Sequence, residues 1–257
     1  AQWINHGGED VVKRLPPTCK VKVVHGNTLT TAAVYEALLR HTSTTDKVFM
    51  TGSTSKIGRA LCLLLARRGN AVRMLSSCEL RCNEIRSEAG QGAGMLRQVR
   101  SFTESDGCRV WVIGKKMSEA EILEHIPVGS VVVDFAVPHI PQHIASRFFY
   151  VNGAALSYSS GDCDLTFVHD VPGTVPACLA ATIVHAREDL GQHECGEVNV
   201  EEVPGWWEKA TKHGFRLECL EKKAKDPSTK LGQADLVKEG LRPIRPRVAE
   251  AASQMCE

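Results

Sequence analysis

The chain has 257 residues, a formal net charge of +1, 43% hydrophobic residues and 24% charged residues. This composition is typical of a soluble globular protein and excludes a mainly disordered chain, a collagen and a coiled coil. The balanced charge gives no reason to expect nucleic acid as a partner, and no run of apolar residues is long enough to predict a membrane-spanning helix.

The first 45 residues are predicted to form an N-terminal cap segment, residues 1–45, that contains a strand and a helix. The chain begins with Ala1 rather than methionine, which is consistent with a fragment of a longer protein. A short strand is expected at Val21–Val24. An amphipathic helix is expected at Leu29–Arg40, with Thr28 as its N-cap.

Residues 46–219 are predicted to form a dinucleotide-binding domain with helices at its C-terminal end. Apolar strands are expected at 48–50, 71–75, 109–113, 131–136 and 148–151, and helices at 57–68, 118–125, 175–190 and 205–213. Strands that alternate with helices indicate a parallel sheet with right-handed crossovers. The predicted fold class is therefore α/β, a Rossmann-like doubly wound parallel sheet with flanking helices. Residues 220–257 lack aromatic side chains and are predicted to be a poorly ordered C-terminal tail.

A dinucleotide-binding turn is predicted where the first strand of this domain runs into its helix. Gly52 permits the tight turn and Gly58 lets the helix pack on the strand, so that backbone N–H groups face a pyrophosphate. Ser55 replaces the middle glycine of the common motif, which is expected to weaken or shift binding. The predicted cofactor-binding residues are Gly52, Ser53, Thr54, Ser55, Lys56, Ile57 and Gly58. The alternative is a domain that keeps the turn for folding and binds no nucleotide.

The end of the second strand indicates which cofactor is preferred. An NAD site places Asp or Glu about 20 residues after the glycines, where the carboxylate holds the ribose hydroxyls. Here Ser76 and Ser77 follow the strand, and the first acid is Glu79. Small polar residues together with Arg81 suit a 2′-phosphate, so NADPH is the predicted cofactor and Ser76 and Arg81 join the predicted site. For Arg81 the alternative is an ordinary solvated surface charge.

Cys178 is the candidate nucleophile. With Thr174 as N-cap, it lies in or just beyond the first turn of the helix predicted from Val175, where the helix dipole lowers a thiol pKa. His185 follows seven positions later, about 10 Å along the helix axis, so it cannot activate the thiol directly. The alternative is a cysteine that acts as a small buried hydrophobic residue.

The other metal and thiol signals are weak. His139 and His143 have the spacing of a ligand pair on a helix, but Pro138 and Pro141 argue against a regular helix there, and no metal site is predicted. The ten cysteines contain no C-x-x-C pair and are too few for a disulfide scaffold, so we expect reduced thiols in a cytosolic environment.

A set of short motifs runs over roughly residues 1–216: Val24–Thr30, Thr51–Ala60, Trp111–Lys115, Val137-Pro138, Ala177-Cys178, Val184-His185, His193–Gly196 and Lys212–Phe215. As a set they resemble the C-terminal domain of the plant eceriferum/glossy proteins, the very-long-chain aldehyde decarbonylase family of wax alkane synthesis. A more distant resemblance links the turn before Thr28, the glycine loop, Asn152-Gly153, Asp170–Pro172 and Ala177-Cys178 to cyanobacterial long-chain acyl-carrier-protein reductases, which form fatty aldehydes. In those enzymes the matching cysteine is taken to carry the acyl group.

The resemblance implies an enzyme domain. NADPH would reduce a long-chain acyl thioester, from acyl-CoA or acyl-carrier protein, to a fatty aldehyde through an acyl-enzyme on Cys178. The family's membrane region and di-iron histidine boxes are not in this chain, so we do not expect the oxygen-dependent step that forms the alkane from these residues. A membrane-bound wax-synthesis partner, or a missing N-terminal membrane region, is expected instead, at the cytosolic face of the endoplasmic reticulum. The family's Gly-Gly pair after the cysteine is Ala181-Thr182 here.

Two other functions stay open. The first is a non-catalytic Rossmann-like interaction module of a wax-synthesis complex. The second is a short-chain-type oxidoreductase, which the sequence disfavours because neither Tyr150 nor Tyr158 has a lysine four residues later.

Overall fold

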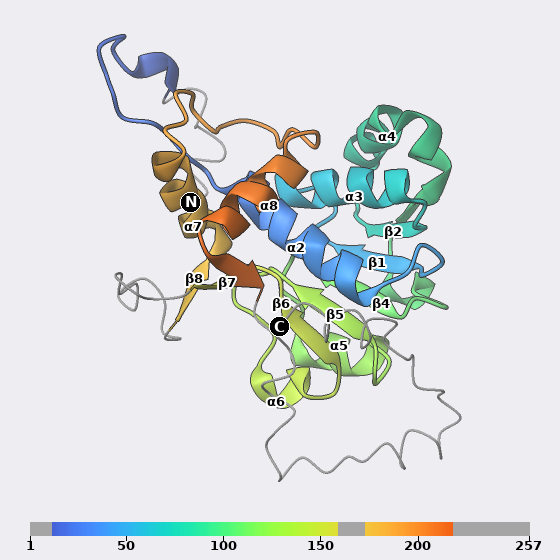
Figure 1. The fold of residues 1–257 in the computed structure, drawn as a ribbon. Helices are drawn as coiled ribbons and strands as arrows, with labels where there is room; N and C mark the ends of the chain where they lie inside the picture. Colours follow the sequence, from blue (N-terminus) through green and yellow to red (C-terminus); the bar gives the residue numbers. More distant parts are fainter. Residues whose placement is uncertain (1–11, 159–172, 218–257) are drawn as a thin grey trace. The chain divides into compact units, whose positions relative to one another are not determined.

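The computed structural model describes residues 12–158 and 173–217. The predicted tail, residues 220–257, and the Asp170–Pro172 motif lie outside them. A six-stranded parallel sheet is at the centre (Figure 1), with the order β3-β2-β1-β4-β5-β6. The strands are β1 (Val48–Thr51), β2 (Val72–Leu75), β3 (Leu96–Val99), β4 (Val110–Ile113), β5 (Val131–Asp134) and β6 (Phe149–Asn152). The order reverses between β1 and β4, so the predicted Rossmann-like doubly wound fold is confirmed.

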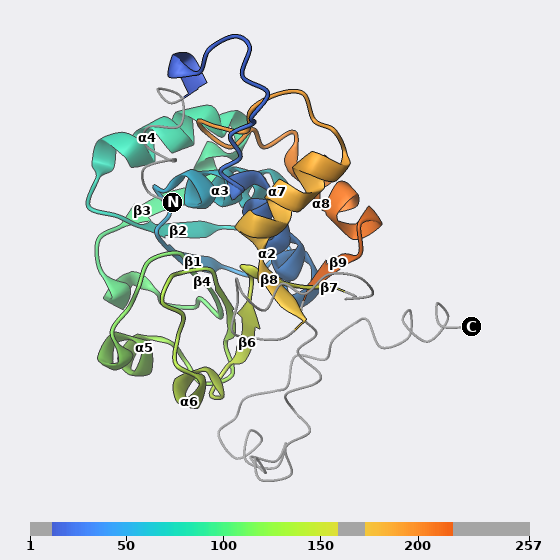
Figure 2. The same ribbon diagram turned by 90° about the vertical axis from the view of Figure 1, so that its left-hand side faces the viewer.

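Helices cover both faces of this sheet (Figures 1 and 2), which is why its central strands are continuous apolar runs buried on both sides. One face carries α2 (Asn27–His41), α3 (Lys56–Arg68) and α4 (Glu79–Glu88), and the other carries α5 (Glu119–His125) and α6 (Gln142–Ala145). Two short 3-10 helices, η1 (Gly90–Met95) and η2 (Phe102–Glu104), flank β3. The core beneath α5 and α6 contains the rings of Phe49 and Trp111, which are tilted by 36° with their centroids 4.4 Å apart.

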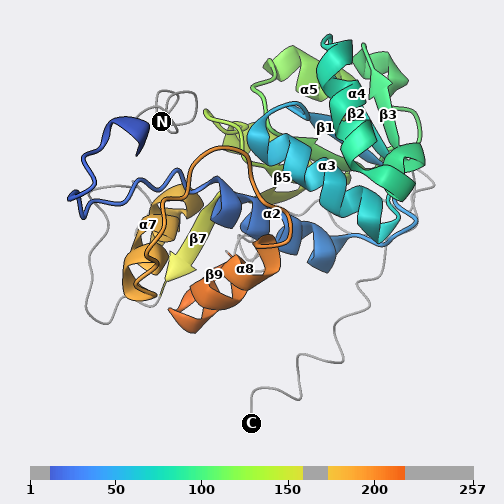
Figure 3. The ribbon, with the colours of Figure 1, turned by 90° about the horizontal axis from the view of Figure 1, so that it is seen from above.

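A small antiparallel sheet holds the C-terminal part of the described chain. Its order is β8-β7-β9, from β7 (Ala155–Tyr158), β8 (Thr174–Pro176) and β9 (Phe215–Leu217). The helices α7 (Ala177–Arg187) and α8 (Val203–Lys212) both pack against α2, and Figure 3 shows α7, α2 and α8 side by side.

Three predictions about element starts are wrong. Val21–Val24 is not a strand, because Val24 makes only an isolated bridge, to Glu194. Thr28 is not the N-cap of α2, since the helix begins one residue earlier after Gly26, and the N–H of Thr28 is bound by Glu194 instead. Thr174 is not the N-cap of α7, because Thr174–Pro176 pairs with β7 and delays the helix to Ala177.

Candidate functional site

A cleft of about 380 Å³ opens at the carboxyl ends of the strands where the sheet order reverses. In open α/β sheets this is the place where ligands bind. The residues that line it follow β1, β2, β3 and β4: Thr51, Gly52, Leu75, Ser76, Ser77, Arg100, Ser101, Phe102, Lys115, Lys116, Met117 and Glu121.

The glycine turn at the base of the cleft is packed backbone against backbone. Gly52 has φ 68°, and a Cβ at this position would lie 2.7 Å from the carbonyl carbon of Gly114. A Cβ at Gly58 would collide with the carbonyl oxygen of Gly52. Both glycines are therefore required for α3 to start directly above β1.

Ser55 is the N-cap of α3. Its hydroxyl accepts a hydrogen bond from the N–H of Gly58 at 3.0 Å. One of the amide groups that a phosphate would otherwise use is thus already bound. Lys56, the first residue of α3, donates from Nζ to the carbonyl of Gly196 at 2.7 Å and so ties the segment after α7 to the glycine turn.

The predicted cofactor-binding residues fall into three groups. Gly52 and Ser76 line the cleft. Ser53, Thr54, Ser55, Lys56, Ile57 and Gly58 form the turn and the start of α3 beside it. Arg81 does not line the cleft, because its guanidinium is bound to Glu84 at 2.9 Å and to Glu197 at 2.8 Å.

The basic side chains that do line the cleft were missed in the sequence. Lys115 and Lys116 follow β4, and Arg100 follows β3, where its guanidinium lies 3.0 Å from an oxygen of the exposed Glu79. Three cations around one cleft favour an anionic ligand. The signal of Arg100 was hidden because β3 has no apolar pattern, so nothing in the sequence placed Arg100 at the end of a strand. Lys115 and Lys116 directly follow the strand predicted at 109–113, and that position could have indicated them.

Cys178 is the second residue of α7, so its predicted position in the first turn is confirmed, and its side chain is exposed. The expected lowering of its pKa is wrong. Surrounding protein atoms desolvate the thiolate and raise the pKa of the thiol above its usual value, and a hydrogen bond from the backbone N–H of Leu179 offsets only part of this effect.

The start of α7 and the glycine turn share one edge of the parallel sheet. The N–H of Ala177 donates to the carbonyl of Ala154, just after β6, at 2.7 Å. No residue of α7 lines the cleft, however. The thiol therefore lies at the β6 end of the edge, and the cleft lies over β1 to β4.

The described residues contain neither a metal-binding cluster nor a membrane-spanning helix. Within 12–158 and 173–217, no group of three or more His, Cys, Asp or Glu side chains could hold a metal ion. The helices of the same ranges are each too short or too polar to cross a bilayer.

The chain matches a family described as the CER1-like C-terminal domain over residues 48–216. The very-long-chain aldehyde decarbonylase GL1-1 of Oryza sativa subsp. indica is 34% identical over 221 residues, an alignment that covers 83% of this chain and 34% of that protein. GL1-2 of the same subspecies is 35% identical over 220 residues, with coverage of 82% and 33%. The chain thus spans about a third of the length of these curated relatives.

Similar solved structures include an L-tryptophan dehydrogenase from Nostoc punctiforme, with a TM-score of 0.44, 11% identity and coverage of 74% of this chain and 52% of that one. An oxidoreductase from Salmonella enterica in complex with NADP has a TM-score of 0.35 and 17% identity, with coverage of 50% and 44%. At these scores the similarity carries no conclusion about function.

Proposed function

The chain belongs to the CER1-like C-terminal domain family, and from this premise we propose that it is the nucleotide-binding domain of a very-long-chain aldehyde decarbonylase-like protein of wax and alkane biosynthesis. The names of its relatives support this role. The chain spans only about a third of those relatives, so we do not assign the activity in their names to these residues alone. We place the domain at the cytosolic face of the endoplasmic reticulum, beside a membrane-bound partner or membrane region.

NADPH is the proposed cofactor, and the cleft over β1 to β4 is its proposed site. The observation that carries the proposal is the combination of a glycine turn, which brings backbone close to a ligand, with three cations around the same cleft. Leu75, Phe102 and Met117 give the cleft an apolar lining suited to an adenine ring.

The end of β2 favours a 2′-phosphate over a free ribose hydroxyl. Ser76 and Ser77 offer hydroxyl groups there, and Arg100 supplies the positive charge that the sequence assigned to Arg81. The acid among the cleft residues, Glu121, is held by Ser118 in the capping box of α5.

The proposed reaction is reduction of a long-chain acyl thioester to a fatty aldehyde. Bound NADPH would supply the hydride. Cys178 would act as the nucleophile: its sulfur forms a bond to the carbonyl carbon, the bond from that carbon to the sulfur of CoA or the carrier protein breaks, and the leaving thiolate takes up the proton that Cys178 gave up. Once the carbonyl carbon has received the hydride, its bond to the sulfur of Cys178 would break, which releases the aldehyde, and the Cys178 thiolate would take up a proton from solvent. The support from the structure is an exposed thiol at a helix start on the same sheet edge as the cleft.

Isothermal titration with NADPH and NADH tests the cofactor site. We expect saturable binding of NADPH that Arg100→Gln weakens about tenfold, with NADH affinity changed less than about twofold, because the lost interaction is with the 2′-phosphate. Arg147→Gln, at an exposed arginine outside the cleft, is the matched control. Absence of saturable binding of either nucleotide would refute the cofactor site and favour the interaction module.

Acyl-CoA-dependent oxidation of NADPH tests the thiol. Cys178→Ser should abolish the reaction, whereas Cys78→Ser, at another exposed thiol, should leave it unchanged. Equal rates for the two variants would remove Cys178 from the mechanism and leave the cofactor site standing.

The interaction module stays a second candidate because two observations favour it. Ser55 uses an amide that a phosphate would need, and the thiol of Cys178 has a raised pKa. A nucleophile of this kind needs a base, and the groups described so far provide none.

A further inference from the structure

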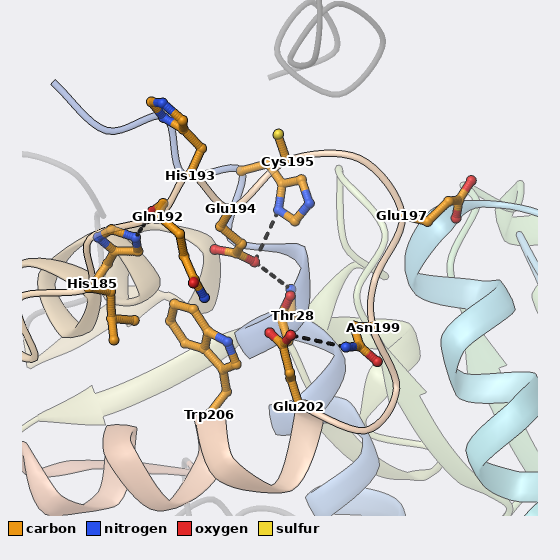
Figure 4. A pocket seen from close by; sticks show the side chains of 12 residues that line it. Thr28, His185, Gln192, His193, Glu194, Cys195, Glu197, Asn199, Glu202 and Trp206 are labelled. Atoms are coloured by element: carbon orange, nitrogen blue, oxygen red, sulfur yellow. Dashed lines mark hydrogen bonds and ion pairs between the residues drawn. The ribbon is translucent and has the colours of Figure 1, made fainter. Parts of the chain in front are cut away.

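A second cavity, of about 140 Å³, lies at the start of α2 (Figure 4). Figure 4 shows His185 of α7, Trp206 of α8 and Glu194 of the segment between these helices around the start of α2. Most of its lining side chains are polar: His25, Thr28, His185, Leu190, Gln192, His193, Glu194, Cys195, Glu197, Asn199, Glu202 and Trp206.

Glu194 binds the start of α2 and the ring of His25 together. Its carboxylate accepts hydrogen bonds from the N–H of Thr28 at 3.1 Å and from the N–H of Gly26 at 3.3 Å. The Nδ1 of His25 lies 3.1 Å from Oε1 of the same carboxylate. The two side chains are only 1% and 10% exposed, so the pair is shielded from solvent.

The carboxylate determines which nitrogen of His25 carries the proton. The N–H of Asn27 also lies 3.1 Å from Nδ1, so Nδ1 can either accept from this amide or donate to Glu194, but it cannot do both. An unprotonated Nδ1 would turn its lone pair toward a carboxylate oxygen, and the two would repel each other. The hydrogen bond to Glu194 therefore favours a proton on Nδ1 and leaves the lone pair of the neutral ring on Nε2.

The Nε2 of His25 is buried and has no hydrogen-bond partner among the described residues. A buried polar atom without a partner costs stability, so such an atom in a native site needs an explanation. An imidazole that is held by a carboxylate through one nitrogen and unpaired at the other has the arrangement of a general base.

The backbone of Cys178 packs against Gly26, the residue that follows His25 in the chain. A Cβ on Gly26 would lie 2.5 Å from the Cα of Cys178. With standard bond lengths and one Cα–Cα step, the Cα atoms of His25 and Cys178 are at most about 8 Å apart. Cys178 also shares a face of α7 with His185, seven residues on, which lines the cavity with His25.

We propose that His25, oriented by Glu194, is the general base that takes the proton from the thiol of Cys178, directly or through one water. This inference rests on the proposed function, because it gives Cys178 the role of nucleophile. The S–H bond of Cys178 breaks, its electron pair stays on sulfur, and the proton bonds to Nε2. The imidazolium, held by the carboxylate of Glu194, then protonates the thiolate of CoA or the carrier protein that leaves the acyl group. This acyl transfer to Cys178 needs no oxidant or reductant.

Four of the other titratable groups that face the cavity are engaged elsewhere, and the fifth, Cys195, is a half-buried thiol rather than a base. His185 binds the carbonyl of Gln192 at 2.8 Å, and Glu202 accepts from Asn199 at 3.0 Å. Glu197 pairs with Arg81, and His193 accepts from the N–H of Val23 through Nδ1 at 3.0 Å. Among the groups around the cavity, the free Nε2 of His25 is thus the one placed to accept a proton beside α7.

Alkylation of Cys178 by iodoacetamide, followed by peptide mass spectrometry between pH 6 and 9, tests the proposal without any enzymatic assay. His25→Gln should lower the rate at Cys178 near pH 7 by about tenfold or more, because the thiol loses its base. The exposed Cys78 is the internal control, and the rate there should be unchanged. His143→Gln, at an exposed histidine of α6, should leave both rates within about twofold of the parent.

Equal rates at Cys178 in the parent and in His25→Gln would overturn the inference. NADPH titration of the same variant separates this failure from failure of the proposed function, because the cleft contains no residue of the His25 cavity. If His25→Gln does not fold, two-bond ¹⁵N–¹H correlation spectra of the unaltered chain decide the question. A proton on Nδ1 of the neutral ring is the expected result, and a neutral ring protonated on Nε2 would overturn the proposal.

Discussion

Gly52 is the residue on which the shape of the cleft depends most directly. Alanine at this position would be held at φ 68°, and its Cβ would lie 2.7 Å from backbone atoms of Gly114, which cannot rotate away as a side chain can. We expect Gly52→Ala to lower the free energy of unfolding by at least about 2 kcal/mol in urea denaturation. Gly94→Ala, at an exposed glycine with open space around it, is the control, and an equal loss in the two variants would contradict the packing argument.

A second prediction at the scale of single residues concerns how the stability contributed by Glu194 depends on pH. Burial raises the pKa of this carboxyl, but hydrogen bonds from His25 and Thr28, together with the charge of the His25 ring once it is protonated in acid, outweigh burial and lower the pKa below its usual value. A carboxyl with a lowered folded pKa stabilises the fold above its unfolded pKa, about 4.3, and this stabilisation is lost as the pH falls through the folded pKa.

Glu194→Gln should therefore lower the free energy of unfolding by about 1–2 kcal/mol at pH 7, and the difference from the parent should shrink below pH 4. Thermal unfolding monitored by circular dichroism from pH 3 to 8 measures both effects. Glu201→Gln, at the exposed partner of Arg67, should change stability by less than about 0.5 kcal/mol at every pH. A difference between parent and Glu194→Gln that stays constant with pH would contradict the assignment.

Individual residues also show what local sequence can and cannot predict. Gly52 and Gly58 were recognisable because a tight turn between a strand and a helix restricts which residues fit. Arg81 was assigned to the cofactor by its distance along the sequence. One of its two partners, Glu84, is local, but the other, Glu197, is 116 positions away in the chain, and no local pattern reports such a pair. The Glu194 carboxylate at the start of α2 was missed for the same reason.

At the scale of elements, the N-cap of α3 determines how many backbone N–H groups at the start of this helix are free to bind a phosphate. The hydroxyl of Ser55 accepts from the N–H of Gly58, so Ser55→Ala should lower the free energy of unfolding by about 1 kcal/mol and Ser55→Gly by only a few tenths. Because glycine also frees the amide of Gly58, Ser55→Gly should bind NADPH more tightly than the parent in calorimetry. Ser87→Ala, at an exposed position within α4, should leave NADPH binding unchanged and should not lower the free energy of unfolding, because alanine favours a helix more than serine does.

The sequence predicted both continuously buried strands and two strands, β2 and β6, that are only partly buried. The strands β1, β4 and β5 are fully buried four-residue runs, and their apolar residues mark them clearly. β3 reads Leu-Arg-Gln-Val and carries no such pattern, because it exists through its parallel register with β2, in which Leu96 faces Val72. β8 likewise depends on pairing with β7, so a prediction from local pattern extended α7 backwards over it.

At the scale of the whole molecule, the two cavities and the thiol are distributed along one edge of the parallel sheet. The cleft belongs to the ends of β1 to β4, whereas the thiol and the cavity beside it belong to the starts of α7 and α2. About three strand spacings, roughly 14 Å, separate β1 from β6. The proposed nucleotide site and the thiol are thus carried by different elements.

This separation predicts that cofactor binding and the thiol can be lost independently. Cys178→Ser should keep the NADPH affinity of the parent within about twofold, because no residue of α7 lines the cleft. At a hundredfold excess of NADPH over its dissociation constant, parent and variant should both gain about 2.7 kcal/mol of stability. Arg100→Gln should lose much of that gain while it keeps the alkylation rate of Cys178. Loss of NADPH affinity in Cys178→Ser, or loss of Cys178 alkylation in Arg100→Gln, would contradict this prediction. Either result would mean that the cleft and the thiol form one site.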